Sequence, residues 1–168
     1  MKKVCRWGAL LLAVGTLCLA VLCLAIWFLS TGNNMERHLE KQLGISLPEG
    51  AEIASLDSHG GFHGDGTLLA VVTVPDKAEQ DALWEQVEDT WSALPADEAI
   101  MEPIRQLWEE RCGALPLLPD TENGRWFYRD RYEEQYGEKC EFNSVLQNCT
   151  FALLDRDSGR LYVLENDC

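Results

Sequence analysis

Two histidines and two aspartates lie close together in a glycine-rich segment, and these residue types can hold a metal ion. Asp57, His59, His63 and Asp65 are separated mainly by small residues. Neutral imidazole nitrogens and carboxylate oxygens are good ligands for zinc and similar divalent ions. The segment is therefore a candidate metal site, with His59, His63 and Asp65 as ligands. A metal-dependent hydrolase is the activity that such a site would support.

The same segment has two further interpretations. The glycines around Gly60 and Gly61 can present backbone N–H groups to an anion or another ligand. They also suit a turn or a bulged hairpin tip, because glycine adopts backbone angles that other residues avoid. His59 and His63 lie four apart in a loop, and the sequence shows no third protein ligand. We therefore expect a structural turn that doubles as a candidate binding site, with no cofactor, and keep a divalent metal as the alternative.

Three arginines form a dense basic group in an otherwise acidic stretch. Arg125, Arg129 and Arg131 alternate with other residues, which places them along one face of a predicted strand. Guanidinium groups bind carboxylates or phosphates with two parallel hydrogen bonds, so Arg129 and Arg131 join the candidate binding residues. The alternative is internal pairing with adjacent acids such as Asp130, Glu133 and Glu134.

Four cysteines follow the N-terminal third of the chain: Cys112, Cys140, Cys149 and Cys168. In an oxidising compartment an even number of cysteines can form two disulfides, in any of three pairings. Buried free thiols are the alternative. No complete catalytic set is present, because Ser58 and His59 are neighbours in sequence and such neighbours do not form a catalytic triad.

One long apolar segment is expected to fix the candidate site residues on one side of a membrane. Residues 7–29 carry no charge and are long enough to cross a bilayer as a helix. Lys2, Lys3 and Arg6 precede the segment, so the positive-inside bias places residues 1–6 in the cytoplasm and the rest of the chain outside. A cleaved signal peptide is the alternative, although its apolar region is usually shorter.

The remaining chain is strongly acidic. All 28 Asp and Glu residues follow the apolar segment, and the net charge of the 168-residue chain is −14. Such a surface repels nucleic acid, so nucleic acid is not an expected partner. An envelope protein, reached from the membrane anchor at 7–29, is the expected partner. The chain length outside the membrane suits one domain.

Hydrophobic patterns predict the elements of that domain. Strands are expected over 51–57 and 67–74, around the glycine loop. Asp76 and Asp97 suit the first positions of two helices, the first running to about residue 93. A strand follows over 125–132, and residues 149–154 and 160–165 suit a hairpin.

These patterns predict an α+β domain in the order β-β-α-α-β-β-β, with an antiparallel sheet and helices on one face. The predicted organisation is a leader at 1–6, a transmembrane helix at 7–29, a juxtamembrane segment at 30–47 and the domain at 48–168.

Three motifs resemble an uncharacterised family of small, single-pass, membrane-anchored proteins of Firmicutes-type bacteria. They are the HGGFHGDG segment at 59–66, the WFYRDR segment at 126–131 and the hairpin at 151–162. The resemblance implies a bacterial setting and an anchor, and it brings no established activity. A histidine often follows the second motif in that family, whereas Tyr132 stands here, which weakens a metal site that needs a third imidazole.

The expected function is a non-catalytic interaction or ligand-binding module on the outer face of a cytoplasmic membrane. The metal-dependent hydrolase is the competing hypothesis.

Overall fold

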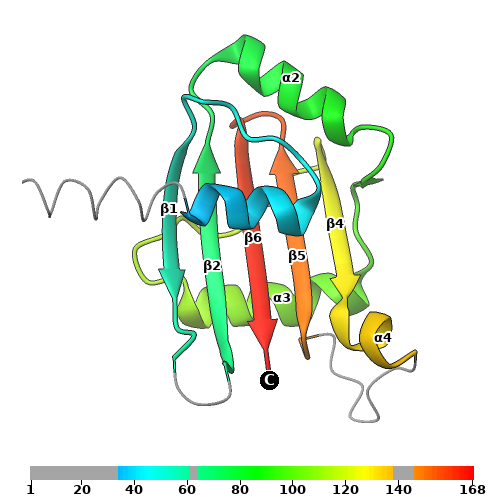
Figure 1. The fold of residues 1–168 in the computed structure, drawn as a ribbon. Coiled ribbons are helices and arrows are strands. Elements are labelled where there is room, and N and C mark those ends of the chain that lie inside the picture. The colour runs from blue at the N-terminus through cyan, green and yellow to red at the C-terminus, as the bar shows by residue number, and fades with distance from the viewer. Residues whose placement is uncertain (1–33, 61–63, 138–145) are drawn as a thin grey trace, which may run out of the picture. The chain divides into compact units, whose positions relative to one another are not determined.

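The computed structural model describes residues 34–60, 64–137 and 146–168. Residues Glu40–Cys168 form one compact unit around a six-stranded antiparallel sheet (Figure 1). In chain order the elements are β1 (Glu52–Asp57), β2 (Gly66–Thr73), α2 (Lys77–Val87), β3 (Ser92–Ala93), α3 (Glu98–Arg111), β4 (Gly124–Asp130), α4 (Arg131–Tyr136), β5 (Cys149–Asp155) and β6 (Arg160–Asp167). The predicted α+β class and antiparallel sheet are confirmed.

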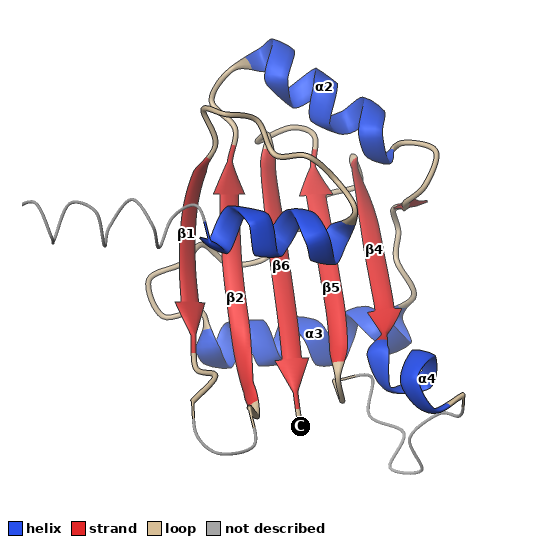
Figure 2. Ribbon diagram, viewed as in Figure 1, coloured by secondary structure: helices blue, strands red, loops and turns tan. Residues whose placement is uncertain are grey.

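The strands lie side by side in the order β1-β2-β6-β5-β4-β3 (Figure 2). Both predicted hairpins are present, because β1 pairs with β2 and β5 pairs with β6, each in antiparallel register. The last strand of the chain, β6, enters the middle of the sheet between β2 and β5. The two hairpins are thereby joined through the β2–β6 pair, which extends from Gly66 opposite Asp167 to Thr73 opposite Arg160.

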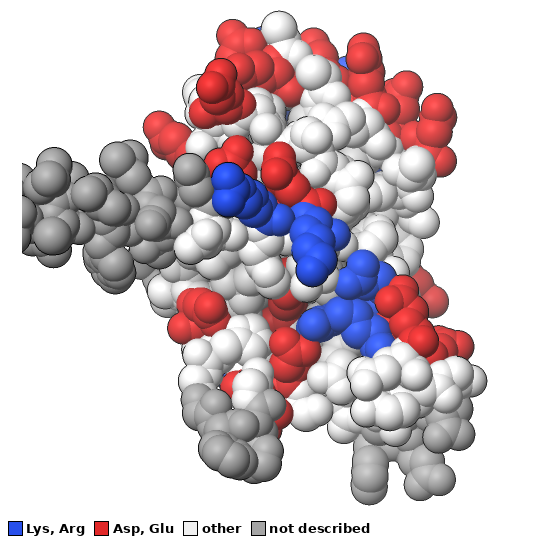
Figure 3. Space-filling view, viewed as in Figure 1, with Lys and Arg blue, Asp and Glu red and all other residues white. Residues whose placement is uncertain are grey.

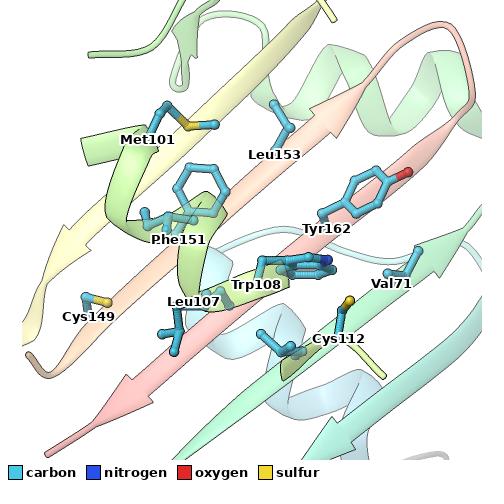
Figure 4. Packing of buried hydrophobic residues seen from close by; sticks show 12 residues of the cluster. Val71, Met101, Leu107, Trp108, Cys112, Cys149, Phe151, Leu153 and Tyr162 are labelled. Carbon is cyan, nitrogen blue, oxygen red and sulfur yellow. The ribbon is translucent and has the colours of Figure 1, made fainter. Parts of the chain in front are cut away.

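The main core lies between the sheet and α3, which runs behind the sheet in the view of Figure 1. Trp108 of α3 is fully buried, and its ring meets the ring of Tyr162 edge-on at 5.8 Å between centroids (Figure 4). Its indole N–H donates to the carbonyl oxygen of Pro116 at 2.9 Å. The indole is therefore buried without losing its hydrogen bond, as a large aromatic core residue requires.

The prediction that helices cover only one face of the sheet is wrong. Leu153 packs toward α3, and its neighbour Leu154 must point to the opposite face because side chains alternate along a strand. Leu154 lines a small hollow together with Leu83 and Trp84 of α2. Every residue of β5 is buried. Because side chains alternate between the two faces of a strand, this burial shows that both faces of the sheet are covered at β5.

The predicted element order was also wrong in the middle of the chain. Helix α2 begins after Asp76, whose side chain accepts the N–H groups of Ala78 and Glu79, but it ends at Val87 instead of near residue 93. The next residues form the two-residue strand β3, which pairs with β4. Short helix α4 follows β4 directly. Both elements are too short to produce a recognisable hydrophobic period.

Helix α3 agrees with the sequence pattern at both ends. Asp97 accepts the N–H of Ala99, and Gly113 follows the helix with a positive φ of 56°. The buried residues of α3 lie at helical spacing and include Ile104 and Trp108. This amphipathic stripe is what attaches the helix to the sheet.

Among the described residues, no helix is long and apolar enough to cross a membrane. The predicted leader at 1–6 and span at 7–29 lie outside the described residues, so the membrane anchor stays a prediction. Residues 34–43 are helical, and the last turn of this helix belongs to the compact unit. Leu43, Ile45 and Leu47 are buried within it.

Candidate functional site

A histidine held between two aspartates is the centre of the candidate site. The Nδ1 atom of His59 lies 2.7 Å from Oδ1 of Asp57, and its Nε2 atom lies 3.0 Å from Oδ2 of Asp167. The backbone N–H of His59 also donates to Oδ1 of Asp57 at 2.9 Å. The imidazole therefore has a carboxylate oxygen at each ring nitrogen.

The sheet topology brings the two aspartates together. Strands β1 and β6 are each antiparallel to β2, so β1 and β6 run in the same direction and finish at the same end of the sheet. Asp57 is the last residue of β1 and Asp167 the last residue of β6. The loop after β1 then has only to turn back over β2 for His59 to reach both carboxylates.

Gly66 makes this close return possible. A Cβ atom at Gly66 would lie 2.6 Å from both the Cα and the backbone nitrogen of His59. Real Cβ atoms do not approach backbone this closely, so any larger residue would push the His59 backbone away. Glycine at position 66 therefore allows the backbone of β2 to lie close to the backbone of His59.

Arg131 completes the cluster, which we call the Asp167 network (Asp57, His59, Arg131 and Asp167). Its Nη2 atom lies 2.8 Å from Oδ1 of Asp167 and donates to the carbonyl oxygens of Cys149 and Asn166 at 3.0 and 3.2 Å. Arg131 is the first residue of α4, because β4 ends at Asp130. The prediction that Arg131 continues the strand face is therefore wrong.

The three arginines do not converge on one site. Arg129 donates to the backbone and side-chain oxygens of Gln42 at 3.2 and 2.7 Å, and its Nε lies 3.6 Å from Glu134. The guanidinium of Arg125 lies over the ring of Trp84, at 5.2 Å from the centroid. Of the two arginines proposed for binding, only Arg131 contacts the residues around His59.

Charged groups of both signs share this end of the sheet. The side chains of the Asp167 network retain between about a fifth and a half of their exposure, from 21% for Arg131 to 48% for Asp57. Across the middle of the face seen in Figure 3, Lys and Arg side chains lie beside Asp and Glu side chains. The network thus contains the Arg131–Asp167 ion pair and remains partly exposed to solvent.

The rest of the glycine loop is only partly within the described residues. Gly60 is exposed, and a Cβ atom there would meet only the backbone oxygen of Ser58, at 3.8 Å; Gly64 has a positive φ of 73°, as a turn requires. Asp65 is exposed. Gly61 and His63 lie outside the described residues, so the structure does not test whether they join the network.

The metal hypothesis gains nothing from the residues that the structure describes. Within these residues, no group of three or more His, Cys, Asp or Glu side chains is arranged to hold a metal ion. His59 would also have to give up a carboxylate contact before either ring nitrogen could bind a metal. Metal binding that involves His63 stays an untested alternative.

Ser58 has a structural place beside the network. Its hydroxyl donates to the backbone oxygen of Thr67 at 3.1 Å and accepts the N–H of Thr67 at 2.9 Å. A hydroxyl used in this way closes the β1–β2 hairpin and is not oriented by His59 as a nucleophile would be.

The cysteines of the described residues are unbridged: Cys112 and Cys149 are buried thiols, and Cys168 is exposed. Cys140 lies outside the described residues, so a disulfide that includes it stays a prediction. Burial raises the pKa of Cys149 to about 12, although the nearby Arg131 acts in the opposite direction. Burial also raises the pKa of Tyr128. A thiol with such a pKa stays protonated at neutral pH and is a poor nucleophile.

Asp167 is the residue that sequence reasoning missed. It lies at the end of the predicted hairpin, where an acidic residue normally indicates a solvated terminus. Its role depends on β6 pairing with β2, and no local pattern specifies that pairing. Searches of known protein families, curated proteins and solved structures found no match to this chain. The family resemblance of the three motifs therefore stays a prediction.

Proposed function

We propose that this chain is a membrane-anchored, extracytoplasmic interaction module that contacts an envelope protein through the Asp167 network. The supporting observation is the meeting of His59 with Asp57 and Asp167, from strands far apart in the chain, in a partly exposed cluster. Partly exposed charges of both signs give a surface orientation and selectivity toward a complementary partner.

The contacts of His59 and Ser58 favour a binding role over a catalytic one. His59 contacts a carboxylate at each ring nitrogen, and the Ser58 hydroxyl is used within the β1–β2 hairpin. A general base needs a free, suitably placed nitrogen beside its nucleophile. Neither residue is arranged for that role, so an interaction surface accounts better for the arrangement than the alternative hydrolase does.

Site-specific photo-crosslinking in intact bacterial cells tests the proposal. A photoreactive amino acid at position 65, exposed in the loop beside His59, should capture one discrete envelope protein. The same group at Asp89, exposed just beyond α2 at the far end of the sheet, is the matched control and should capture none.

A second variant connects the capture to the network itself. Asp167→Asn removes the charge that holds both His59 and Arg131, and it should reduce the adduct at position 65 severalfold. Equal capture from positions 65 and 89, no adduct at all, or an adduct unaffected by Asp167→Asn would each contradict the proposal.

A further inference from the structure

Strand β1 forms an edge of the sheet. It pairs with β2 on one side, and none of the strands in the described residues pairs with its other side. A sheet edge carries a row of backbone donors and acceptors, which an extended peptide can use by adding as a further strand. The question is whether β1 is built to allow such addition.

The register identifies the backbone groups that face outward. Ser58 donates its N–H to the backbone oxygen of Thr67 at 3.0 Å, so Ser58 and Thr67 form a hydrogen-bonded pair. Hydrogen-bonded and non-hydrogen-bonded pairs alternate along an antiparallel ladder, and the β1–β2 register is unbroken. The backbone N–H and C=O groups of Ile53 and Ser55 therefore point away from β2.

β1 lacks the features that usually protect an edge. Natural edges are blunted by lysine, proline, bulges or very short strands. β1 has six residues, carries neither lysine nor proline, and keeps small residues at its centre, Ala54 and Ser55. Its charged residues, Glu52 and Asp57, stand only at its two ends. Most of its side chains are exposed. The strand is therefore accessible along its length.

A groove lies at the C-terminal end of β1, on the α3 face of the sheet. Its volume is about 310 Å³, and its lining residues are Leu56, Asp57, Ser58, Thr67, Leu69 and Arg111. Leu56 is 40% exposed, which is unusual for leucine in this domain. The groove thus offers an apolar surface at one end of the edge strand.

Arg111 supplies the charge of the groove. Its Nη1 atom donates to the hydroxyl of Thr67 at 3.2 Å, and no acidic side chain among the described residues forms a salt bridge with it. The acidic residue of the groove, Asp57, is engaged by His59. A guanidinium has five N–H donors, so Arg111 can still receive a carboxylate.

We propose that the open edge of β1 binds an extended peptide segment of a protein partner. The peptide adds as a strand along Ile53 and Ser55, places one apolar side chain over Leu56 in the groove, and presents a carboxylate to Arg111. This site shares Asp57 with the Asp167 network. Its binding contacts, the β1 backbone and Arg111, lie outside that network, so each proposal can fail while the other stands.

The test uses the full-length protein in lipid nanodiscs and a displayed library of random decapeptides with free carboxyl termini. Enriched peptides should share alternating β-branched or apolar residues and an acidic group. The best peptide is then synthesised, and its affinity is measured by fluorescence polarisation. Amide chemical-shift changes should concentrate at Ile53 and Ser55.

Ser55→Pro is the decisive variant, and Ser55→Ala is its matched control. Proline removes an outward N–H and no β1–β2 hydrogen bond, so it should weaken peptide binding about tenfold, as for one or two lost hydrogen bonds. Ser55→Ala keeps the N–H and should bind within about twofold of the parent.

Arg111→Gln decides the matter if Ser55→Pro does not fold. It should weaken the acidic peptide about tenfold, as expected for a lost charged pair. Replacing the peptide carboxylate by an amide should then cause no further loss in Arg111→Gln, while it weakens binding to the parent. Absence of any enriched peptide, or equal affinity for the parent and for both Ser55→Pro and Arg111→Gln, would overturn the proposal.

Discussion

His59 and Asp167 are 108 residues apart in the chain, and their Nε2 and Oδ2 atoms lie 3.0 Å apart. This contact joins the loop after the first strand of the domain to the end of its last strand. Arg131 contacts the other oxygen of the same carboxylate. Asp167 is therefore the residue on which the proposed interaction surface depends.

Asp167→Asn should destabilise the domain only modestly. The pairs are partly exposed, so solvent screens them, and we expect a loss of about 0.5–1 kcal/mol in the free energy of unfolding. Urea denaturation measures it. Glu102→Gln removes an exposed helical pair with Arg105 and should cost less, under about 0.5 kcal/mol. A loss above about 3 kcal/mol for Asp167→Asn would mean that the network is a buried structural element instead.

Gly66→Ala should be far more damaging than Gly60→Ala. The new methyl group at position 66 would meet the His59 backbone at 2.6 Å, whereas at position 60 the nearest atom is 3.8 Å away. Overpacking of this kind costs about 1–3 kcal/mol. Thermal unfolding of the two variants should show a clear decrease for the first and almost none for the second. Equal melting temperatures would contradict the close approach.

Trp108 and Trp84 should differ in their contributions to stability. Trp108 is fully buried, whereas Trp84 is partly exposed, with Arg125 and Arg156 over its ring. Trp108→Ala should cost about 3–5 kcal/mol. Trp84→Ala should cost about 1–2 kcal/mol, the value of cation–π contacts near a surface. Denaturant titration of the two variants side by side measures the difference.

Stability should fall in alkaline solution through Cys149. Its pKa is about 12 in the folded chain and near 9.0 when unfolded, so the unfolded state loses the thiol proton first. The contribution of the protonated thiol is complete below pH 9 and is lost as pH rises from 9 toward 12, by at most roughly 1.4 kcal/mol per pH unit.

Comparison with two alanine variants isolates this effect. Cys149→Ala should make the decline in the free energy of unfolding above pH 9 shallower, even though the lost side chain lowers stability at neutral pH. A decline that remains at higher pH is expected from Tyr128, whose pKa is also raised by burial. Cys168→Ala removes an exposed thiol and should leave the decline intact. Parallel pH curves for the parent and Cys149→Ala would show that another group is responsible.

The predicted membrane placement has a direct test. The full-length chain should sediment with membranes and resist extraction by high salt or alkaline carbonate, because residues 7–29 are apolar and uncharged. Protease added to spheroplasts should digest the domain after residue 30 while a cytoplasmic marker survives. Recovery of the full-length chain in the soluble fraction, or a domain protected in spheroplasts, would refute the anchor or its orientation.

The amino-acid sequence by itself determined most of the local elements of this protein. Alternation and turn residues predicted both hairpins, and Asp76 and Asp97 marked the starts of the two main helices. These signals are local, since a side chain a few residues away satisfies each cap and each strand shows its own period. The α+β class followed from the same patterns.

Only the tertiary structure decided how the elements meet. The insertion of β6 between β2 and β5, the cover on both faces of the sheet and the short strand β3 leave no periodic trace in sequence. The candidate site depends on the insertion of β6, because His59 can reach Asp167 only when β1 and β6 finish at the same end of the sheet. Strand pairing across such a distance is selected by the burial energy of the whole core, which no short segment encodes.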